Sequence, residues 1–397
     1  MKGLPRLYTG TFFMMSAANL CTVSSFSCFF LFPLYITEHG GDKADIGIVM
    51  GVMALSSVIC RPWISEMIDR IGRKRSYTMG CLIMTALPLA YLLLRGDIHR
   101  SYPFLLLVRL IHGVGLAICF TSVFTYMADI IPEVRLNEGI GMFGVTGLSG
   151  MAVGPVVGEE IISHFGFSTF FLAASGLGAL GLLFHLPLSE SYAPGGGRSG
   201  RSFFEVLGMK KIRLISLMAL LFGFGMAAYS GFVTPFASEV ELRFVSLYYV
   251  AYSFAAVGTR LFGGRLADRV GELRVLPWAL AFSGGGLLML LFLNGYVVLA
   301  IAGMLAGCGH GFLFPSLNAL AIRDESIEIR GKINGVFTGG IDTGAFLGGI
   351  SLGYVGRWAG YRVLFFTAGF AVLAGLWVFR AYAAWERKMS TSRAESR

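Results

Sequence analysis

Arg61-Pro-Trp-Ile-Ser-Glu-Met-Ile-Asp-Arg-Ile-Gly-Arg-Lys74 is a basic stretch between two hydrophobic runs, and its pattern returns about 199 residues later. The second copy is Arg260-Leu-Phe-Gly-Gly-Arg-Leu-Ala-Asp-Arg-Val-Gly271, again with a hydrophobic run on each side. One pair of membrane helices with a short basic turn has therefore been built twice. We predict two homologous halves in a lipid bilayer.

The composition agrees with a membrane protein. Of 397 residues, 55% are hydrophobic and 14% are charged, and the chain holds 34 Phe and 54 Gly, which suits closely packed membrane helices. A spanning helix needs roughly 20 apolar residues. Twelve such runs lie near 8–32, 43–67, 76–95, 102–127, 139–162, 166–187, 213–236, 245–265, 275–294, 297–322, 332–355 and 361–384. We predict an all-α polytopic membrane protein with twelve transmembrane helices in two pseudo-symmetric six-helix bundles.

One long polar stretch, rich in Gly and Ser, follows Leu188 and suits a flexible linker. It divides the chain into an N-terminal six-helix bundle (1–188), a cytoplasmic linker (189–212) and a C-terminal six-helix bundle (213–388). Residues 203–211 have room for a short interfacial helix. The polar tail 389–397 lacks hydrophobic periodicity and is expected to be disordered.

The basic residues orient the chain. With a cytoplasmic N-terminus, most Lys and Arg of the loops and tails lie on the inner side, and the outer side carries only Lys43, Arg95, Arg100, Arg243, Arg357 and Arg362. The positive-inside rule then places both termini in the cytoplasm. The net charge of +9 is spread over helix ends and forms no stripe for nucleic acid. We expect a multi-pass, monomeric protein of the bacterial cytoplasmic (inner) membrane, with an uncleaved first span.

The sequence contains no motif typical of an enzyme active site or a metal site. All six cysteines fall inside apolar runs without metal-ligand or CxxC spacing, and the chain has neither a P-loop nor an HExxH motif. We expect no metal, no cofactor and no catalytic residue. The expected partners are membrane lipid, a small-molecule substrate and protons.

Three motifs resemble those of the major facilitator superfamily from Tyr8 to about Glu386. The family's Gly-x-Leu-Ala-Asp-Arg-x-Gly-Arg-Lys loop is matched in both halves, its Arg-x-x-Gln-Gly-x-Gly motif in span 4, and its Gly-x-x-x-Gly-Pro-x-x-Gly-Gly motif in span 5. The matching residues are Asp69, Arg70, Gly72, Arg73 and Lys74; Gly264, Leu266, Ala267, Asp268, Arg269 and Gly271; Arg109, Gly113 and Gly115; and Gly150, Gly154, Pro155 and Gly158. His112 stands where the family often has Gln, and Glu159 replaces the final Gly.

The resemblance implies alternating access. With twelve spans and short loops, the sequence is similar to bacterial drug/proton antiporters and to sugar-efflux members of the arabinose efflux permease type. In the family the span 5 motif is associated with export. The loop motif is expected to act as a gating latch in which Asp69 and Asp268 pair with a neighbouring Arg. Gly150, Gly154 and Gly158 share one helix face, and we expect a close, bendable seam between the halves there.

Ionisable groups at membrane depth are costly and therefore mark candidate sites. Asp342 in span 11 is expected to exchange a proton, unless Arg109 or a histidine holds it ionised; a purely structural ion pair is the alternative. Polar residues recur every four positions along its helix, so one stripe should face the central cavity. The predicted proton-coupling or substrate path comprises Asp342, Arg109, His112, His310, Asn334, Thr338 and Asn19.

Other residues have alternative interpretations. Tyr229, Phe232, Tyr248, Tyr249 and Tyr252 could line the path for a planar or amphipathic solute, or anchor the spans at the membrane interface. Solvated positions at the outer end are expected for Glu159 and Glu160. Arg61 and Arg260, each eight residues before a loop Asp, are expected to extend to the cytoplasmic face.

These features predict a secondary active transporter, with proton-coupled efflux of a small amphiphilic, neutral or anionic solute such as a drug, sugar or metabolite. The excess of cationic over acidic candidates disfavours multivalent cationic drugs. The alternative is uptake of a sugar or organic anion by proton symport or facilitated diffusion.

Overall fold

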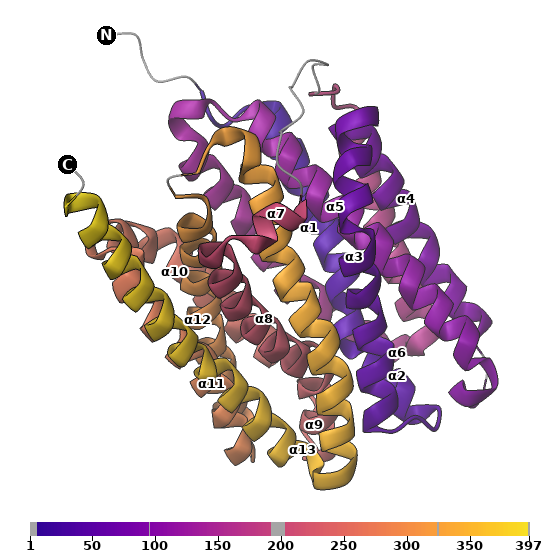
Figure 1. Cartoon of the computed structure of the whole chain (residues 1–397). Helices are drawn as coiled ribbons and strands as arrows, with labels where there is room; N and C mark the ends of the chain where they lie inside the picture. Colours follow the sequence, from indigo (N-terminus) through magenta and orange to yellow (C-terminus); the bar gives the residue numbers. More distant parts are fainter. Residues whose placement is uncertain (1–5, 95, 192–202, 324, 396–397) are drawn as a thin grey trace.

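The computed structural model describes residues 6–94, 96–191, 203–323 and 325–395, with the side chains of all of these except 137, 263–269, 327–328 and 389–395. Every regular secondary-structure element in the described residues is a helix (Figure 1). The N-terminal half comprises α1 (Gly10–Cys28), η1 (Phe29–Leu31), α2 (Phe32–Glu38), α3 (Lys43–Ile71), α4 (Arg73–Ala90), η2 (Tyr91–Leu93), η3 (Ile98–Ser101), α5 (Tyr102–Ile130), η4 (Glu133–Arg135) and α6 (Leu136–His185). The C-terminal half comprises α7 (Phe203–Gly208), α8 (Lys210–Gly231), α9 (Val233–Glu239), α10 (Leu247–Val270), α11 (Glu272–Met289), η5 (Leu290–Phe292), α12 (Tyr296–Ile322) and α13 (Ile327–Glu395).

Twelve membrane crossings follow from these helices. Within the described residues, nine helical segments are long and apolar enough to span a bilayer. Two of them, α6 and α13, contain two crossings each, because the backbone turns at Gly166 and Gly360. With α10 the total is the predicted twelve, and the all-α membrane fold is confirmed.

Backbone geometry repeats between the halves. Gly72 and Gly271 adopt φ of 103° and 87° and begin α4 and α11. Gly166 and Gly360 adopt φ of 75° and 82°. These left-handed conformations are open to glycine at no steric cost. Since Gly72 and Gly271 belong to the two basic stretches, the sequence repeat is also a repeat of turns.

The two ends of the bundle differ in what they carry. The linker end holds the start of α1, the end of α6, helix α7 and the last turns of α13 (Figure 1). The far end holds the turn between α2 and α3 and the bends at Gly166 and Gly360. Helix α7 forms within the range predicted for a short helix. Helix α13 continues to Glu395, where composition predicted disorder.

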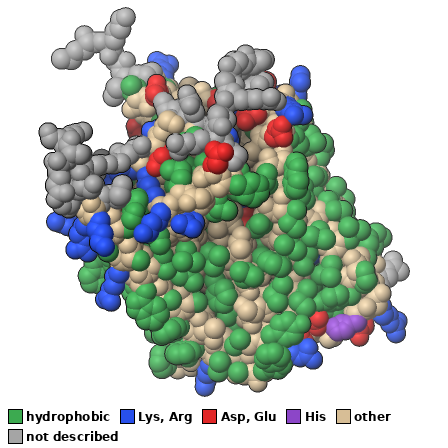
Figure 2. Space-filling view, viewed as in Figure 1, with side chains coloured by type: hydrophobic (Ala, Val, Ile, Leu, Met, Phe, Trp, Pro, Cys, Tyr) green, Lys and Arg blue, Asp and Glu red, His purple; other side chains and the backbone are tan. Residues whose placement is uncertain are grey.

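The outer surface of the bundle is apolar. Phe254 and Trp278 expose 77% and 68% of their surface, although both are large hydrophobic residues. Figure 2 shows hydrophobic side chains covering the side of the molecule, with Lys, Arg, Asp and Glu gathered toward its ends. Such a belt is stable against lipid tails and would be unfavourable in water.

Glycines bring the halves together toward the far end. Gly47 of α3 meets the backbone of α13 at Gly349 and Gly353, with no room for a Cβ atom. Gly51 lies against the Phe346 carbonyl on the same seam, which we call the α3–α13 seam.

Candidate functional site

An ion pair joins the halves in the middle of the molecule. Arg61 of α3 pairs with Asp342 of α13, and both side chains are largely shielded, at 13% and 26% exposure. Ser57 donates to the Asp342 carboxylate at 2.7 Å and accepts from Arg61 at 3.2 Å. The second Arg61 nitrogen donates to Thr338 at 2.7 Å. The prediction that Arg61 extends to the cytoplasmic face is wrong, because a carboxylate on the other half is a better partner than the membrane surface.

The predicted polar stripe on α13 is thus partly engaged. Thr338 and Asp342 face α3 and hold Arg61. Asn334, one turn nearer the linker end, is exposed, and its carbonyl accepts the Thr338 hydroxyl at 2.7 Å. The stripe therefore begins at Asp342, where α13 contacts α3, and ends at Asn334, which is exposed toward the linker end.

Two other members of the predicted path lie inside the N-terminal half. Arg109 is 1% exposed and donates to the Val49 carbonyl at 3.1 Å, with its guanidinium 5.6 Å from the Phe32 ring centroid. His112 is fully buried, 3.3 Å from the Tyr91 hydroxyl and edge-on to Phe29. Neither contacts Asp342 among the described interactions. Sequence spacing put Arg109 and His112 on one helix face correctly, but that face points into its own bundle.

Asn19 is also part of the N-terminal half. It is 4% exposed and donates to the Thr146 hydroxyl of α6 at 2.8 Å, beside Gly147. The bond spans α1 and α6, the two helices that also share the glycine face of the span 5 motif. A role in positioning α6 follows directly from this contact.

The glycines of span 5 pack within the N-terminal half. Gly150 and Gly154 lie against α1, and the Ser27 hydroxyl donates to the Gly150 carbonyl at 2.8 Å. Gly158 meets Leu31, and Pro155 is a buried residue in the same helix. The predicted seam between the halves is therefore wrong for this face, because α1 and α6 approach within one bundle.

Glu159, the departure from that motif, connects the halves at the far end. Its carboxylate accepts from the backbone N–H groups of Val245 and Ser246, at 2.7 and 3.1 Å, just before α10 begins. A carboxylate is favourable at a helix N-terminus, where unpaired N–H groups carry partial positive charge. Glu160 is exposed, in agreement with the prediction, whereas the same prediction is wrong for Glu159.

Two ion pairs close the far end further. Arg357 lies 3.1 Å from Asp42, and Lys43 lies 3.4 Å from Glu239. Together with Glu159 and the α3–α13 seam they hold the two halves against each other. In this structure the far end is closed.

The predicted aromatic residues form a buried cluster in the C-terminal half. Tyr229, Phe232, Tyr248, Tyr249 and Tyr252 are at most 4% exposed. The hydroxyl of Tyr252 bonds to that of Tyr229 at 3.2 Å and to His310, so the predicted residue His310 belongs to this cluster. Tyr249 shares a 2.9 Å hydrogen bond with Thr234, whose hydroxyl donates to the Phe30 carbonyl of the other half.

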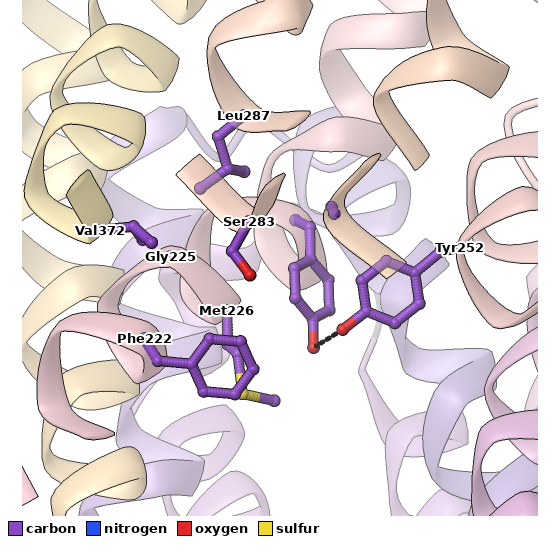
Figure 3. Close-up of a pocket in the computed structure, with 9 residues that line it drawn as sticks. Phe222, Gly225, Met226, Tyr252, Ser283, Leu287 and Val372 are labelled. Atoms are coloured by element: carbon purple, nitrogen blue, oxygen red, sulfur yellow. Dashed lines mark hydrogen bonds between the residues drawn. The ribbon is translucent and has the colours of Figure 1, made fainter. Parts of the chain in front are cut away.

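A small cavity lies beside this cluster (Figure 3). Phe222, Met226, Ser283 and Tyr252 surround it, and the Ser283 hydroxyl has no partner among the described residues. The cavity has room for about one water molecule. It is too small for a drug-sized solute, so this cavity, which Tyr229 and Tyr252 line, is no substrate site in this conformation.

The first copy of the loop motif forms one charged cluster. Arg73 lies 3.1 Å from Asp129 of α5 and 3.4 Å from Asp69. Asp69 is 70% exposed, and Arg70 pairs with Glu66 on the surface. Asp69 makes no described contact with the C-terminal half.

The start of α4 is capped from a distant position. Glu190 accepts from the backbone N–H groups of Arg73, Lys74 and Arg75 at 2.9 to 3.2 Å, and its carboxylate lies where a Cβ at Gly72 would stand. Sequence analysis missed Glu190 and Asp129, since nothing in their local patterns links them to a turn more than 50 residues away.

The second copy carries the opposite charge at one position. Glu272 stands 199 residues after Arg73, and it pairs with Arg323 at the end of α12. This hydrogen bond raises the pKa of Arg323, which keeps the pair ionised. Gly271 precedes the first residue of α11, and the side chains of Asp268 and Arg269 lie outside the described residues.

Comparisons with known proteins agree with this architecture. The model of the Major Facilitator Superfamily matches residues 13–249 and 215–396. The chain is 25% identical over 397 residues to proteins named multidrug resistance protein MdtG from Salmonella choleraesuis (strain SC-B67) and Salmonella arizonae, covering 97% of this chain and 95% of each relative.

Solved structures share the fold at lower identity. The human organic anion transporter MFSD10 (TETRAN) matches with a TM-score of 0.71 and 15% identity, over 95% of this chain and 100% of that one. A mutant form of the nucleoside transporter NupG matches with a TM-score of 0.72 and 17% identity, over 94% and 98%. On the family match, the two-half architecture and the repeated loop, this chain belongs to the major facilitator superfamily and is a secondary transporter, not an enzyme.

Proposed function

We propose that the protein is a proton-coupled exporter of a small amphiphilic, neutral or anionic solute, working by alternating access in a bacterial cytoplasmic membrane with both termini inside. The observation that carries the proposal is the Arg61–Asp342 pair between the halves. The names of the MdtG relatives support export, and the positive-inside distribution of Lys and Arg supports the orientation.

The pair provides a chemical switch. An ionised Asp342 holds Arg61, Ser57 and Thr338 in one network across α3 and α13. A proton on Asp342 removes the negative charge, so the attraction that joins the halves at this depth weakens. Proton binding and release then change the relative stability of the two conformations, as coupling requires.

The geometry assigns the present conformation. The far end, which the proposed orientation places outside, is closed by Glu159, by two ion pairs and by the α3–α13 seam. At the linker end, Asp69, Trp63 and Asn334 are exposed. This arrangement corresponds to a state that is closed to the outside.

Accumulation in transporter-deficient bacterial cells tests the proposal. A panel of dyes, antibiotics, sugars and organic acids is measured in cells expressing wild type, Asp342→Asn or Glu160→Gln, with and without a protonophore. We expect wild type and Glu160→Gln to lower accumulation of at least one compound until the protonophore is added. Asp342→Asn should lose this export.

Two results would contradict the proposal. Protonophore-sensitive export that survives in Asp342→Asn would remove Asp342 from the coupling step. Accumulation that rises with wild type would instead support the uptake of a sugar or organic anion.

A further inference from the structure

The two halves carry one arginine each at related positions of the interface. Arg61 in α3 and Arg260 in α10 are 199 residues apart, as are the two basic stretches. Arg61 reaches across to α13, and Arg260 reaches across to α6, where its guanidinium leaves no room for a side chain at Gly144. The sequence-based expectation that Arg260 extends to the cytoplasmic face is therefore wrong.

The partners of the two arginines differ completely. Arg61 has three oxygen-bearing partners, Ser57, Thr338 and Asp342. The position related to Ser57 by the same 199-residue offset is Ala256. The positions related to Thr338 and Asp342 by the 194-residue offset between Gly141 and Gly335 are Gly144 and Leu148. Every oxygen around Arg61 thus has an apolar or absent side chain as its counterpart around Arg260.

Arg260 is accordingly a cation without a counter-charge. The described residues offer its guanidinium no hydrogen bond and no ion pair, and its Nε atom is buried without a partner. Its described contact partner is the Phe314 ring, 6.0 Å away, which lies beside His310. A guanidinium has five N–H donors, and a ring face satisfies none of them fully. Leaving such a group partly buried is costly unless another molecule supplies acceptors.

We infer that Arg260 binds the anionic group of the transported solute, a carboxylate, sulfonate or phosphate carried on an apolar body. The inference rests on the proposed function and names its substrate class. Planar oxyanions match the two-pronged donor geometry of Arg. Gly144 and Phe314 around the guanidinium suit an apolar body and provide no competing carboxylate.

The two arginines would have different roles in transport. Arg61 is paired with Asp342, the proposed proton-binding residue, whereas Arg260 would pair with the anionic group of the solute. An anion at Arg260 would bridge α10 and α6 much as Asp342 bridges α13 and α3. Solute and proton would then act on two related contacts of one interface.

Binding to the purified full-length protein in a neutral detergent tests the inference without a proton gradient. The probes are naphthalene-1-sulfonate and the matched uncharged naphthalene-1-sulfonamide, measured by isothermal titration calorimetry. We expect wild type to prefer the sulfonate at least tenfold, about the worth of one charge-assisted contact. Arg260→Gln should bind both probes equally, and Arg260→Lys should keep part of the preference.

A second variant tests the inference if Arg260→Gln does not fold. Leu148→Asp places a carboxylate at the position related to Asp342, where it would neutralise Arg260 internally and abolish the preference. Absence of the preference in wild type, or its persistence in Arg260→Gln or Leu148→Asp, would overturn the inference. Competition by added phosphatidylglycerol would assign the site to a lipid headgroup and overturn the solute assignment.

Asp342→Asn separates this inference from the proposed function. Its binding preference for the sulfonate should remain, because Arg260 does not contact Asp342 among the described interactions. Loss of proton-driven export with retained sulfonate binding supports both. Proton-driven export by wild type without a preference for the sulfonate would contradict the anion site and leave the proposed function intact.

Discussion

Arg61 shows what a single residue contributes to a two-half transporter. Its guanidinium uses two nitrogens on three partners, two of them on the opposite half. Desolvating such a pair is costly, and the hydrogen bonds from Ser57 and to Thr338 offset much of that cost. In the proposed coupling step, a proton on Asp342 would remove the attraction that joins the two halves through this pair.

Removing one of these bonds should weaken the network in a measurable way. Thr338→Val deletes the acceptor for Arg61 while keeping the shape of the side chain, and should destabilise the closed far-end state by about 1 kcal/mol. The loss of stability is measured by thermal unfolding of the purified protein, and its effect on transport is measured by the rate of export. Thr338→Ser keeps the hydroxyl and should behave as wild type; equal losses in both variants would show that the methyl group, not the bond, matters.

At the scale of helices, small residues decide which elements touch. The span 5 glycines allow α6 to approach α1 inside one half, whereas Gly47, Gly51 and Gly349 allow α3 to approach α13 across the halves. Without a hydrophobic driving force between helices in lipid, such close contacts supply much of the attraction. Sequence alone shows the glycine faces but not the partner helix, because either partner satisfies the same pattern.

The α3–α13 seam should tolerate no side chain at its tightest point. Gly47→Ala places a Cβ atom against the Gly349 backbone, so we expect α3 and α13 to separate at the far end and export to fall at least tenfold. Gly285→Ala in α11 is the matched control, since a Cβ there meets nothing within 4 Å. Normal export by Gly47→Ala would show that the seam is not needed in the transport cycle.

At the scale of the whole molecule, the two halves share helices and turns but not polar chemistry. Arg73 pairs with Asp129 at the end of α5, whereas Glu272 at the related position pairs with Arg323 at the end of α12, and Arg61 has a carboxylate that Arg260 lacks. The repeat therefore supplies a symmetric frame for the proposed alternating access, and under the two proposals above its divergence would supply separate sites for proton and solute. The far end is held closed by contacts that must all break when the molecule opens there.

Cross-linking follows this movement. In a cysteine-free background, an Asp42→Cys and Arg357→Cys pair should link through a short bifunctional thiol reagent at the far end, because Arg357 Nε and the Asp42 carboxylate meet there at 3.1 Å. A Ser65→Cys and Asn334→Cys pair, on exposed positions of α3 and α13, should link only when the linker end closes. We expect solute or a change of pH to favour one link at the expense of the other. Simultaneous formation of both links in one molecule would contradict alternating access.

Twelve spans, two related halves and the family were all readable from hydrophobic run length and from the repeated basic turn, since these depend on residues close together in the chain. The partners of the polar residues were not. Arg109 and His112 turned into their own bundle, Glu159 capped a helix of the other half, and Arg61, expected at the membrane surface, reached Asp342. Helical periodicity gives the face a residue shares, but the rotation of each helix and the neighbour it meets arise from packing over the whole bundle.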